Sequence, residues 1–145
     1  MTRRRFAAFL AAPFALSCGS DDIVFHDLEA QTYEFIAWEG AIELTAAQEA
    51  VKKAALEAIP APCFSDNTAY TCCCPCNISR SLWGLTHHLI AERNWNADQV
   101  RAKAKEWLAF IAPDGHSGET CYTGGCNRSF KEDGCGGMNP DQVRF

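Results

Sequence analysis

Nine cysteines in 145 residues constrain this chain more than any other feature, because four of them fall within five positions, at Cys72, Cys73, Cys74 and Cys76. The other five are Cys18, Cys63, Cys121, Cys126 and Cys135. Cytosolic proteins of this size rarely carry so many thiols, whereas small exported domains use cysteines for disulfides or metal sites. The cysteine content therefore predicts a protein that works outside the cytoplasm.

The first eighteen residues have the layout of an export signal. Arg3, Arg4 and Arg5 precede an apolar run over residues 6–16, which is too short to anchor the chain in a membrane. This start resembles the twin-arginine signal, which implies export of the folded chain. The stretch 15–18 resembles a bacterial lipobox, with its aliphatic residue one place later than usual, so we expect lipidation of Cys18. Simple cleavage nearby, with Cys18 left free, is the alternative.

This leader sets the predicted domain organisation. We expect an export signal over 1–18, a tether over 19–27 and a single cysteine-rich helical domain over 28–145. The predicted location is the periplasm or the outer membrane surface, with the membrane contacted through a lipid anchor. If Cys18 carries the lipid, eight cysteines remain, an even number that suits an oxidising compartment.

The charge balance excludes one class of partner. The formal net charge is −5, and it becomes more negative once the three arginines of the leader are set aside. An acidic surface repels phosphate backbones, so we expect no nucleic acid partner. A protein partner in the cell envelope is compatible with this charge.

Hydrophobic periodicity predicts an all-α fold, a small bundle of three or four helices with an irregular C-terminal tail from residue 116 onward. We expect a short helix over 28–38, a second from a capping box at Thr45 to Pro60, and a third over 79–94. A fourth helix begins at the cap Asn96 and ends at the Pro113-Asp114-Gly115 turn.

The connection between the third and fourth predicted helices brings the cysteines together. A short link makes these helices antiparallel neighbours, so the start of one lies beside the end of the other. The 72–76 stretch precedes the third helix, and Cys121, Cys126 and Cys135 follow the fourth. Cys63, just after the second helix, is carried toward the same region. We therefore predict one cysteine-rich pole made of loops.

The first interpretation of this pole is a soft-metal site, with Cu(I) as the expected ion and zinc as the alternative. Thiolates select such ions, and four thiols in five residues exceed what disulfides conveniently use. A c-type haem is excluded, because Asn77 stands where the attachment motif needs histidine. The predicted ligands are Cys72, Cys73, Cys74, Cys76, Cys121, Cys126 and Cys135, with Met138 or His116 completing the site.

Two other interpretations stay open. The eight remaining cysteines could form four structural bridges in a non-catalytic interaction domain. Alternatively, Cys73 and Cys76 form a C-x-x-C pair before a helix, whose N-terminus stabilises a thiolate. Cys73 would then be the nucleophile and Cys76 the resolving thiol in exchange with a partner's disulfide. A binding protein is favoured over an enzyme.

Two resemblances rest on short motifs within residues 72–115. Cys72-Cys73-Cys74-Pro75-Cys76 is similar to the core of exported bacterial proteins named for a PCYCGC motif, although that motif's tyrosine and glycine are replaced here by Cys73 and Pro75. The stretch 73–115 also resembles the periplasmic thiol-oxidoreductase subunit of cytochrome c maturation. That second resemblance implies that Cys73 and Cys76 reduce another protein's disulfide. The tail cysteines are foreign to it.

Overall fold

The computed structural model describes residues 22–72 and 74–145, so the predicted export signal, Cys18 and Cys73 lie outside the described residues. Within these ranges the chain forms four α-helices: α1 (Leu28–Ala41), α2 (Ala46–Leu56), α3 (Asn77–Ala91) and α4 (Ala97–Ile111). Two strands, β1 (Pro60–Ala61) and β2 (Phe64–Thr68), separate α2 from α3, and two short 3₁₀ turns lie in the tail. The fold is therefore helix-rich but not purely all-α, which corrects the predicted class.

The helix starts follow the capping signals in the sequence. The side chains of Thr45 and Asn96 each accept a hydrogen bond from the backbone N–H three residues on. In return, the side-chain oxygens of Gln48 and Gln99 accept from the backbone N–H of the capping residue. These reciprocal bonds satisfy donors that a helix N-terminus otherwise leaves open. Both predicted capping boxes are confirmed.

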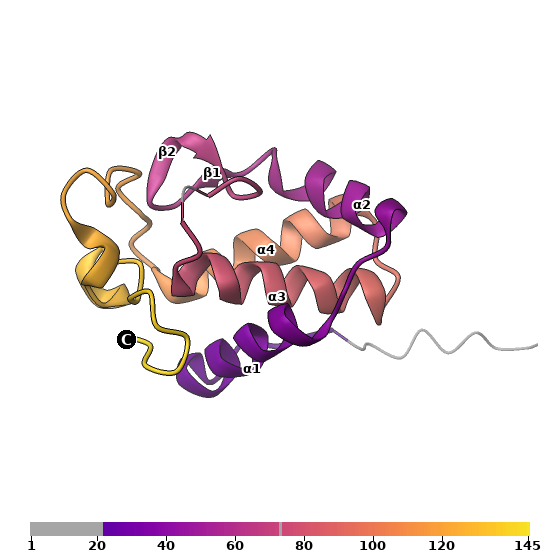
Figure 1. Cartoon of the computed structure of the whole chain (residues 1–145), viewed down its shortest axis with the longest axis horizontal. Coiled ribbons are helices and arrows are strands. Elements are labelled where there is room, and N and C mark those ends of the chain that lie inside the picture. Colours follow the sequence, from indigo (N-terminus) through magenta and orange to yellow (C-terminus); the bar gives the residue numbers. More distant parts are fainter. Residues whose placement is uncertain (1–21, 73) are drawn as a thin grey trace, which may run out of the picture.

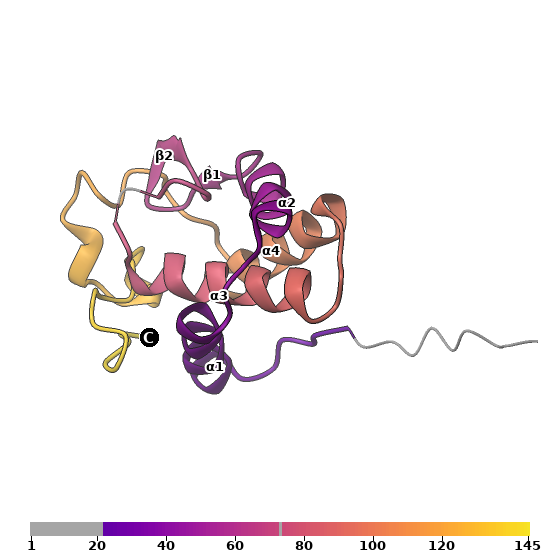
Figure 2. The same cartoon turned by 45° about the vertical axis from the view of Figure 1, so that its right-hand side comes forward.

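α3 lies at the centre of the bundle, with α4 antiparallel beside it (Figure 1). α1 packs against one side of α3, and α2 with the β-hairpin lies on the other (Figure 2). The contact between α1 and α3 is close because Gly84 has no side chain: a Cβ there would lie 1.7 Å from the carbonyl oxygen of Phe35. Trp107 of α4 completes the core, with its ring centroid 4.8 Å from that of Phe35.

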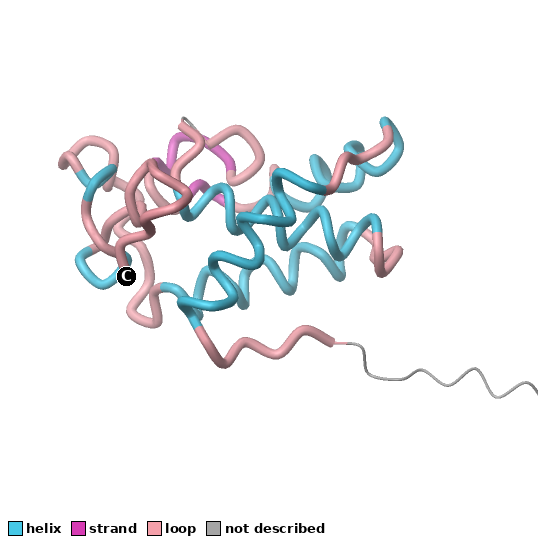
Figure 3. Tube along the Cα trace, turned by 60° about the horizontal axis from the view of Figure 1, so that its bottom comes forward, coloured by secondary structure: helices cyan, strands magenta, loops and turns pink. Residues whose placement is uncertain are grey.

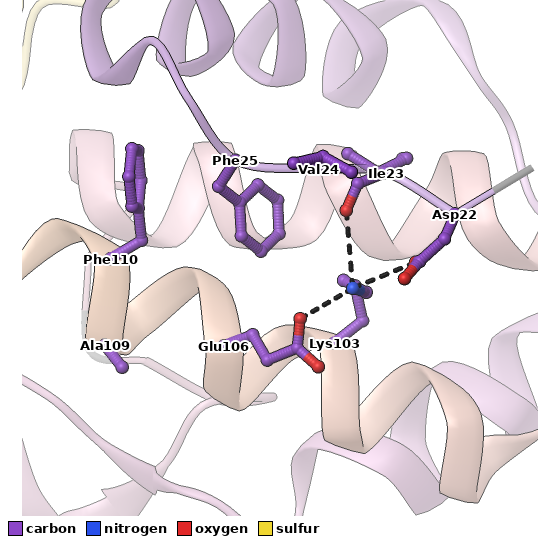
Figure 4. A pocket seen from close by; sticks show the side chains of 8 residues that line it. All are labelled: Asp22, Ile23, Val24, Phe25, Lys103, Glu106, Ala109 and Phe110. Carbon is purple, nitrogen blue, oxygen red and sulfur yellow. Dashed lines mark hydrogen bonds and ion pairs between the residues drawn. The ribbon is translucent and has the colours of Figure 1, made fainter.

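Residues 22–27, predicted as a tether, run along α4 and are held there by a buried lysine (Figure 4). The Nζ atom of Lys103 lies 2.9 Å from Asp22 and 2.6 Å from Glu106. Burial opposes the lysine charge, but these two carboxylates outweigh burial and raise the pKa of Lys103. The ring of Phe25 packs at a tilt against Trp107, with the centroids 5.1 Å apart, so this segment belongs to the packed domain.

The loops collect at one end of the molecule, where α3 begins and α4 ends. Figure 3 shows the helices at one side and the hairpin, the loop residues 69–72 and 74–76 and the C-terminal tail gathered at the other. The predicted convergence of the cysteine-bearing segments at one pole is thus visible in the backbone. No helix among the described residues is both long enough and apolar enough to cross a membrane.

Candidate functional site: a cluster of four thiols

Four cysteines from four different segments meet at this pole, and we call Cys63, Cys72, Cys76 and Cys135 the thiol cluster. The Sγ atoms of Cys63 and Cys72 are 3.2 Å apart. The Cys63 side chain also interacts with Cys76 and Cys135, and Cys76 interacts with all three of the others. All four are present as thiols. Cys63 and Cys76 therefore each interact with all the other members. This pattern describes one compact group of thiols rather than two separate pairs.

Each thiol of the cluster is carried by a different local structure. Cys63 lies in the turn between β1 and β2, and Cys72 in the loop that follows β2. Cys76 is the N-cap of α3, with its Sγ atom 3.4 Å from the hydroxyl of Ser79. Cys135 lies in the tail, 59 positions after Cys76 in the chain. The cluster therefore links the hairpin, the central helix and the tail.

The tail is fixed to the first turn of α3 by backbone and side-chain hydrogen bonds. The backbone N–H groups of Asn77 and Ile78 donate to the carbonyls of Gly137 and Cys135, at 3.0 and 3.2 Å. The Asn77 side-chain amide donates to the carbonyls of Gly136 and Asn139, both at 2.9 Å. These bonds satisfy open donors of the helix N-terminus and bring Cys135 beside Cys76.

Backbone bonds also tie the hairpin turn to the tail. The N–H of Cys121 donates to the carbonyl of Cys63 at 2.9 Å, and the N–H of Ser65 donates to Gly118 at 2.9 Å. Within the tail, the N–H of Cys135 donates to Gly125 at 3.0 Å. The positions of Cys63 and Cys135 are thus set by main-chain hydrogen bonds as well as by their own side chains.

The thiols of the cluster differ in the direction in which their pKa values are shifted. Interactions with Cys135, Cys63 and Cys72 lower the pKa of Cys76, and they outweigh its burial. The pKa of Cys63 is raised first by its interaction with Cys135, and that of Cys72 by its interaction with Cys63. Since a helix N-terminus favours negative charge, Cys76 is the member that holds an anion best.

The predicted ligands divide between the cluster and its surroundings. Cys72, Cys76 and Cys135 belong to the cluster. Cys126 is half-buried and lies close enough to raise the pKa of Cys135 by its charge. Cys74 and Cys121 are half-buried at the same pole, and each takes part in an interaction of its own. Met138 is 38% exposed on the surface of the tail.

His116 lies in a hollow of about 310 Å³ beside the hairpin rather than in the thiol cluster. Its Nε2 atom is buried and has no hydrogen-bond partner among the described residues, and burial lowers the pKa of the ring. The hollow is lined by Pro60, Ala61, Pro62, Ser65, Leu108, Ser117 and Gly118 in addition to the histidine. No described contact joins His116 to a cluster thiol.

Cys63 is the cluster member that the predicted ligand set lacks. The sequence placed it near the pole, but its position in a turn that looked irregular gave no reason to rank it above Cys121 or Cys126. The signal that could have found it is the even count of eight cysteines, in which every thiol needs a role.

His87 and His88 lie on α3 away from the cluster, as their position along the helix predicts. His87 donates from Nδ1 to the carbonyl of Ile42 at 2.9 Å, so its Nε2 accepts from Lys52 Nζ, also at 2.9 Å. The ring of His88 stacks on Trp38 with centroids 3.9 Å apart. Both histidines connect helices.

A hollow of about 530 Å³ lies between the 22–25 segment and α4 (Figure 4). Its polar centre is Lys103, whose ammonium group already contacts Asp22, Glu106 and the carbonyl of Ile23. The lining contains no thiol or imidazole. This hollow therefore offers a ligand few open polar groups.

The thiol cluster allows two kinds of chemistry. A group of four interacting thiols suits a thiophilic metal ion, although no group of three or more His, Cys, Asp or Glu side chains in residues 22–72 and 74–145 forms a metal site as it stands. A tetrahedral zinc site with Zn–S bonds of about 2.3 Å separates its sulfurs by about 3.8 Å. The Cys63 and Cys72 sulfurs, at 3.2 Å, would have to move slightly apart. Thiols this close also suit disulfide formation.

Comparison with known proteins finds no match. No protein family model matches the chain. No curated protein and no solved structure matches it either. The two motif resemblances noted from the sequence stay predictions.

Proposed function

We propose that the protein binds a soft metal ion at the thiol cluster, in the cell envelope. The observation that carries this proposal is the connectivity of the cluster, in which Cys63 and Cys76 each interact with the other three thiols. A pair of structural disulfides needs only two separate contacts. A single thiophilic ion instead uses several sulfurs that all lie near one another, and the shared interactions of Cys63 and Cys76 are of that kind.

The local environment supports an anionic metal–thiolate centre. Three of the four thiols are buried, with exposed fractions of 1% for Cys63 and 0% for Cys76 and Cys135. The α3 N-terminus next to Cys76 stabilises negative charge there. The sequence pointed to Cu(I), and a complete set of four thiolates is equally typical of zinc. Metal identity is therefore the first question for experiment.

The test is a metal titration of the full, reduced, chelator-treated chain. We expect one equivalent of Cu(I) or Zn²⁺ to be held against a colorimetric chelator specific for each ion. A metal present at 100 times its dissociation constant should raise the free energy of unfolding by up to about 2.7 kcal/mol, the value for an ion that binds the folded chain alone. A protein that releases both ions to weak chelators would contradict the proposal.

Two cysteine variants locate the ion. Cys135→Ser removes one sulfur of the cluster, so we expect metal affinity to fall by more than about 100-fold, because the outer partners of a ligand alone account for about 10–100-fold. Cys126→Ser, the matched control, removes a half-buried tail thiol outside the cluster and should leave affinity near that of the parent. Equal losses in the two variants would place the ion elsewhere at the pole.

A structural disulfide framework is the second candidate, favoured by the distance between Cys63 and Cys72 and by the interaction of Cys76 with Cys135. Counting free thiols and retained metal together by mass spectrometry of the exported protein separates the two functions. Eight oxidised thiols without metal would leave only the structural role.

A further inference from the structure

The four thiols of the cluster differ in their access to solvent. Cys63, Cys76 and Cys135 are buried, whereas Cys72 is only half-buried. A reagent from solution therefore meets the cluster first at Cys72. This order of access is set by the fold, because Cys72 lies on the loop after β2 and Cys76 is enclosed by α3 and the tail.

The sulfur placed to react second is that of Cys63. Its Sγ atom lies 3.2 Å from the Sγ atom of Cys72, and both belong to the segment that includes the hairpin. Main-chain bonds from Cys121 and Ser65 hold the hairpin turn on the tail. A bond between Cys63 and Cys72 closes a short loop of the chain and leaves the helical bundle as it is.

We propose that Cys72 and Cys63 form a redox pair that exchanges with an external disulfide, and that this reaction releases the metal. The release step rests on the proposed function, since it needs a metal on the same sulfurs. The exchange step does not. The pair differs from the C-x-x-C pair predicted from the sequence, whose second member, Cys76, is fully buried.

The reaction balances with a small-molecule disulfide as the oxidant. Cys72 gives its proton to solvent, and its sulfur attacks one sulfur of the external disulfide, which expels the other as a thiolate. Cys63 then loses its proton and attacks the Cys72 sulfur of the mixed disulfide, which expels the second thiolate. Both expelled thiolates take up protons. Two protein thiols are thus oxidised and one external disulfide is reduced to two thiols.

Metal binding and disulfide formation compete, because the Cys63–Cys72 disulfide takes two of the four sulfur ligands away from the metal. Sulfurs joined in a disulfide are no longer thiolates, and the thiolate is the form that binds a metal. Cys76 and Cys135 then remain as a two-sulfur site. We expect the oxidised cluster to lose its ion to a chelator that the reduced cluster resists.

The experiment treats the full, reduced chain with limiting oxidised glutathione and maps the products by mass spectrometry. The metal-free arm should give the Cys63–Cys72 disulfide as the first intramolecular product. Cys63→Ser should instead accumulate one glutathione on Cys72, because the resolving sulfur is missing. Cys126→Ser, a half-buried thiol outside the cluster, should behave as the parent.

The outcomes separate the two proposals. A first disulfide between Cys76 and Cys135, or a glutathione adduct of Cys63→Ser on any cysteine other than Cys72, would overturn the redox pair. In the metal-loaded arm we expect one ion released for each Cys63–Cys72 disulfide formed. An ion retained after that disulfide forms overturns the release step. A chain that binds no metal but still forms this disulfide overturns the proposed function and, with it, the release step, and leaves the redox pair supported.

Discussion

Asn77 is the residue that holds the tail against the start of α3. Its side-chain amide is fully buried and donates two hydrogen bonds, to the carbonyls of Gly136 and Asn139. The same tail segment carries Cys135, whose carbonyl accepts from the second residue of α3. The fourth sulfur of the cluster therefore depends on a side chain that is neither a thiol nor a metal ligand.

Replacing Asn77 by Asp tests this dependence with a side chain of the same shape. A carboxylate turns two donated bonds into repulsion between oxygens, at a cost of about 1–3 kcal/mol or more. Negative charge in the first helical turn recovers only about 0.3–1 kcal/mol, so the loss dominates. We expect a lower free energy of unfolding in denaturant titrations and weaker metal binding.

The matched control for that variant is Asn139→Asp. Asn139 is exposed, and its side chain acts only as an acceptor, from the N–H of Asp141 at 3.0 Å, a role that aspartate keeps. We expect parental stability and metal affinity. Equal effects of the two substitutions would mean that added charge on the tail, rather than the amide donors of Asn77, is responsible.

For individual residues, the sequence predicted which thiols would lie at one pole but not which of them would be in contact. Cys72, Cys76 and Cys135 could be named because they flank two antiparallel helices. The contact between Cys63 and Cys72 depends on a hairpin turn, and the place of Cys135 depends on Asn77 and on backbone carbonyls of the tail. Long-range bonds of this kind leave no periodic signal in the chain.

Among the helices, the close packing of α1 on α3 depends on Gly84. A Cβ at this position would lie 1.7 Å from the carbonyl oxygen of Phe35 and 2.8 Å from the amide nitrogen of Glu39. Both neighbours are backbone, so a rotamer change cannot relieve the overlap. The two helices would have to move apart.

Gly84→Ala should therefore destabilise the protein by more than about 3 kcal/mol, the upper end of ordinary overpacking. Gly40→Ala is the matched control, because Gly40 also lies in a helix but a Cβ there meets no atom of the described residues within 4 Å. That substitution should stabilise by up to about 1 kcal/mol through helix propensity. Chemical denaturation measures both changes, and a neutral Gly84→Ala would contradict the close packing of α1 on α3.

The elements themselves were predictable to different degrees. α2, α3 and α4 follow from apolar periodicity, and the two capping boxes are where the sequence placed them. α1 begins where a short helix was expected, but its sequence has no comparable periodicity. The β-hairpin was missed because β1 has two residues and pairs with β2 through an irregular register, from Pro60↔Thr68 to Ala61↔Phe64. A two-residue strand that begins at Pro60 and is followed by Pro62 has no alternation to recognise.

Across the whole molecule, three histidines are desolvated by the packing of the helices and the tail. Burial lowers the pKa of His87, His88 and His116, and the nearby charges of Lys52 and Arg93 lower the first two further. In the unfolded chain each has a pKa of about 6.5. The folded state therefore takes up fewer protons than the unfolded state below that pH.

This difference makes the fold sensitive to mild acid. Stability rises with pH wherever the unfolded state binds more protons, so the contribution of these histidines is complete above about pH 6.5 and is lost as pH falls through their lowered folded values. We expect the free energy of unfolding of the reduced, metal-free chain to decrease between about pH 7 and pH 5, measured by urea denaturation at each pH.

His87→Gln should flatten this dependence, because the amide can donate to Ile42 and accept from Lys52 without titrating. An equally steep decrease in the His87 variant would assign the acid sensitivity to the other two histidines or to carboxylates.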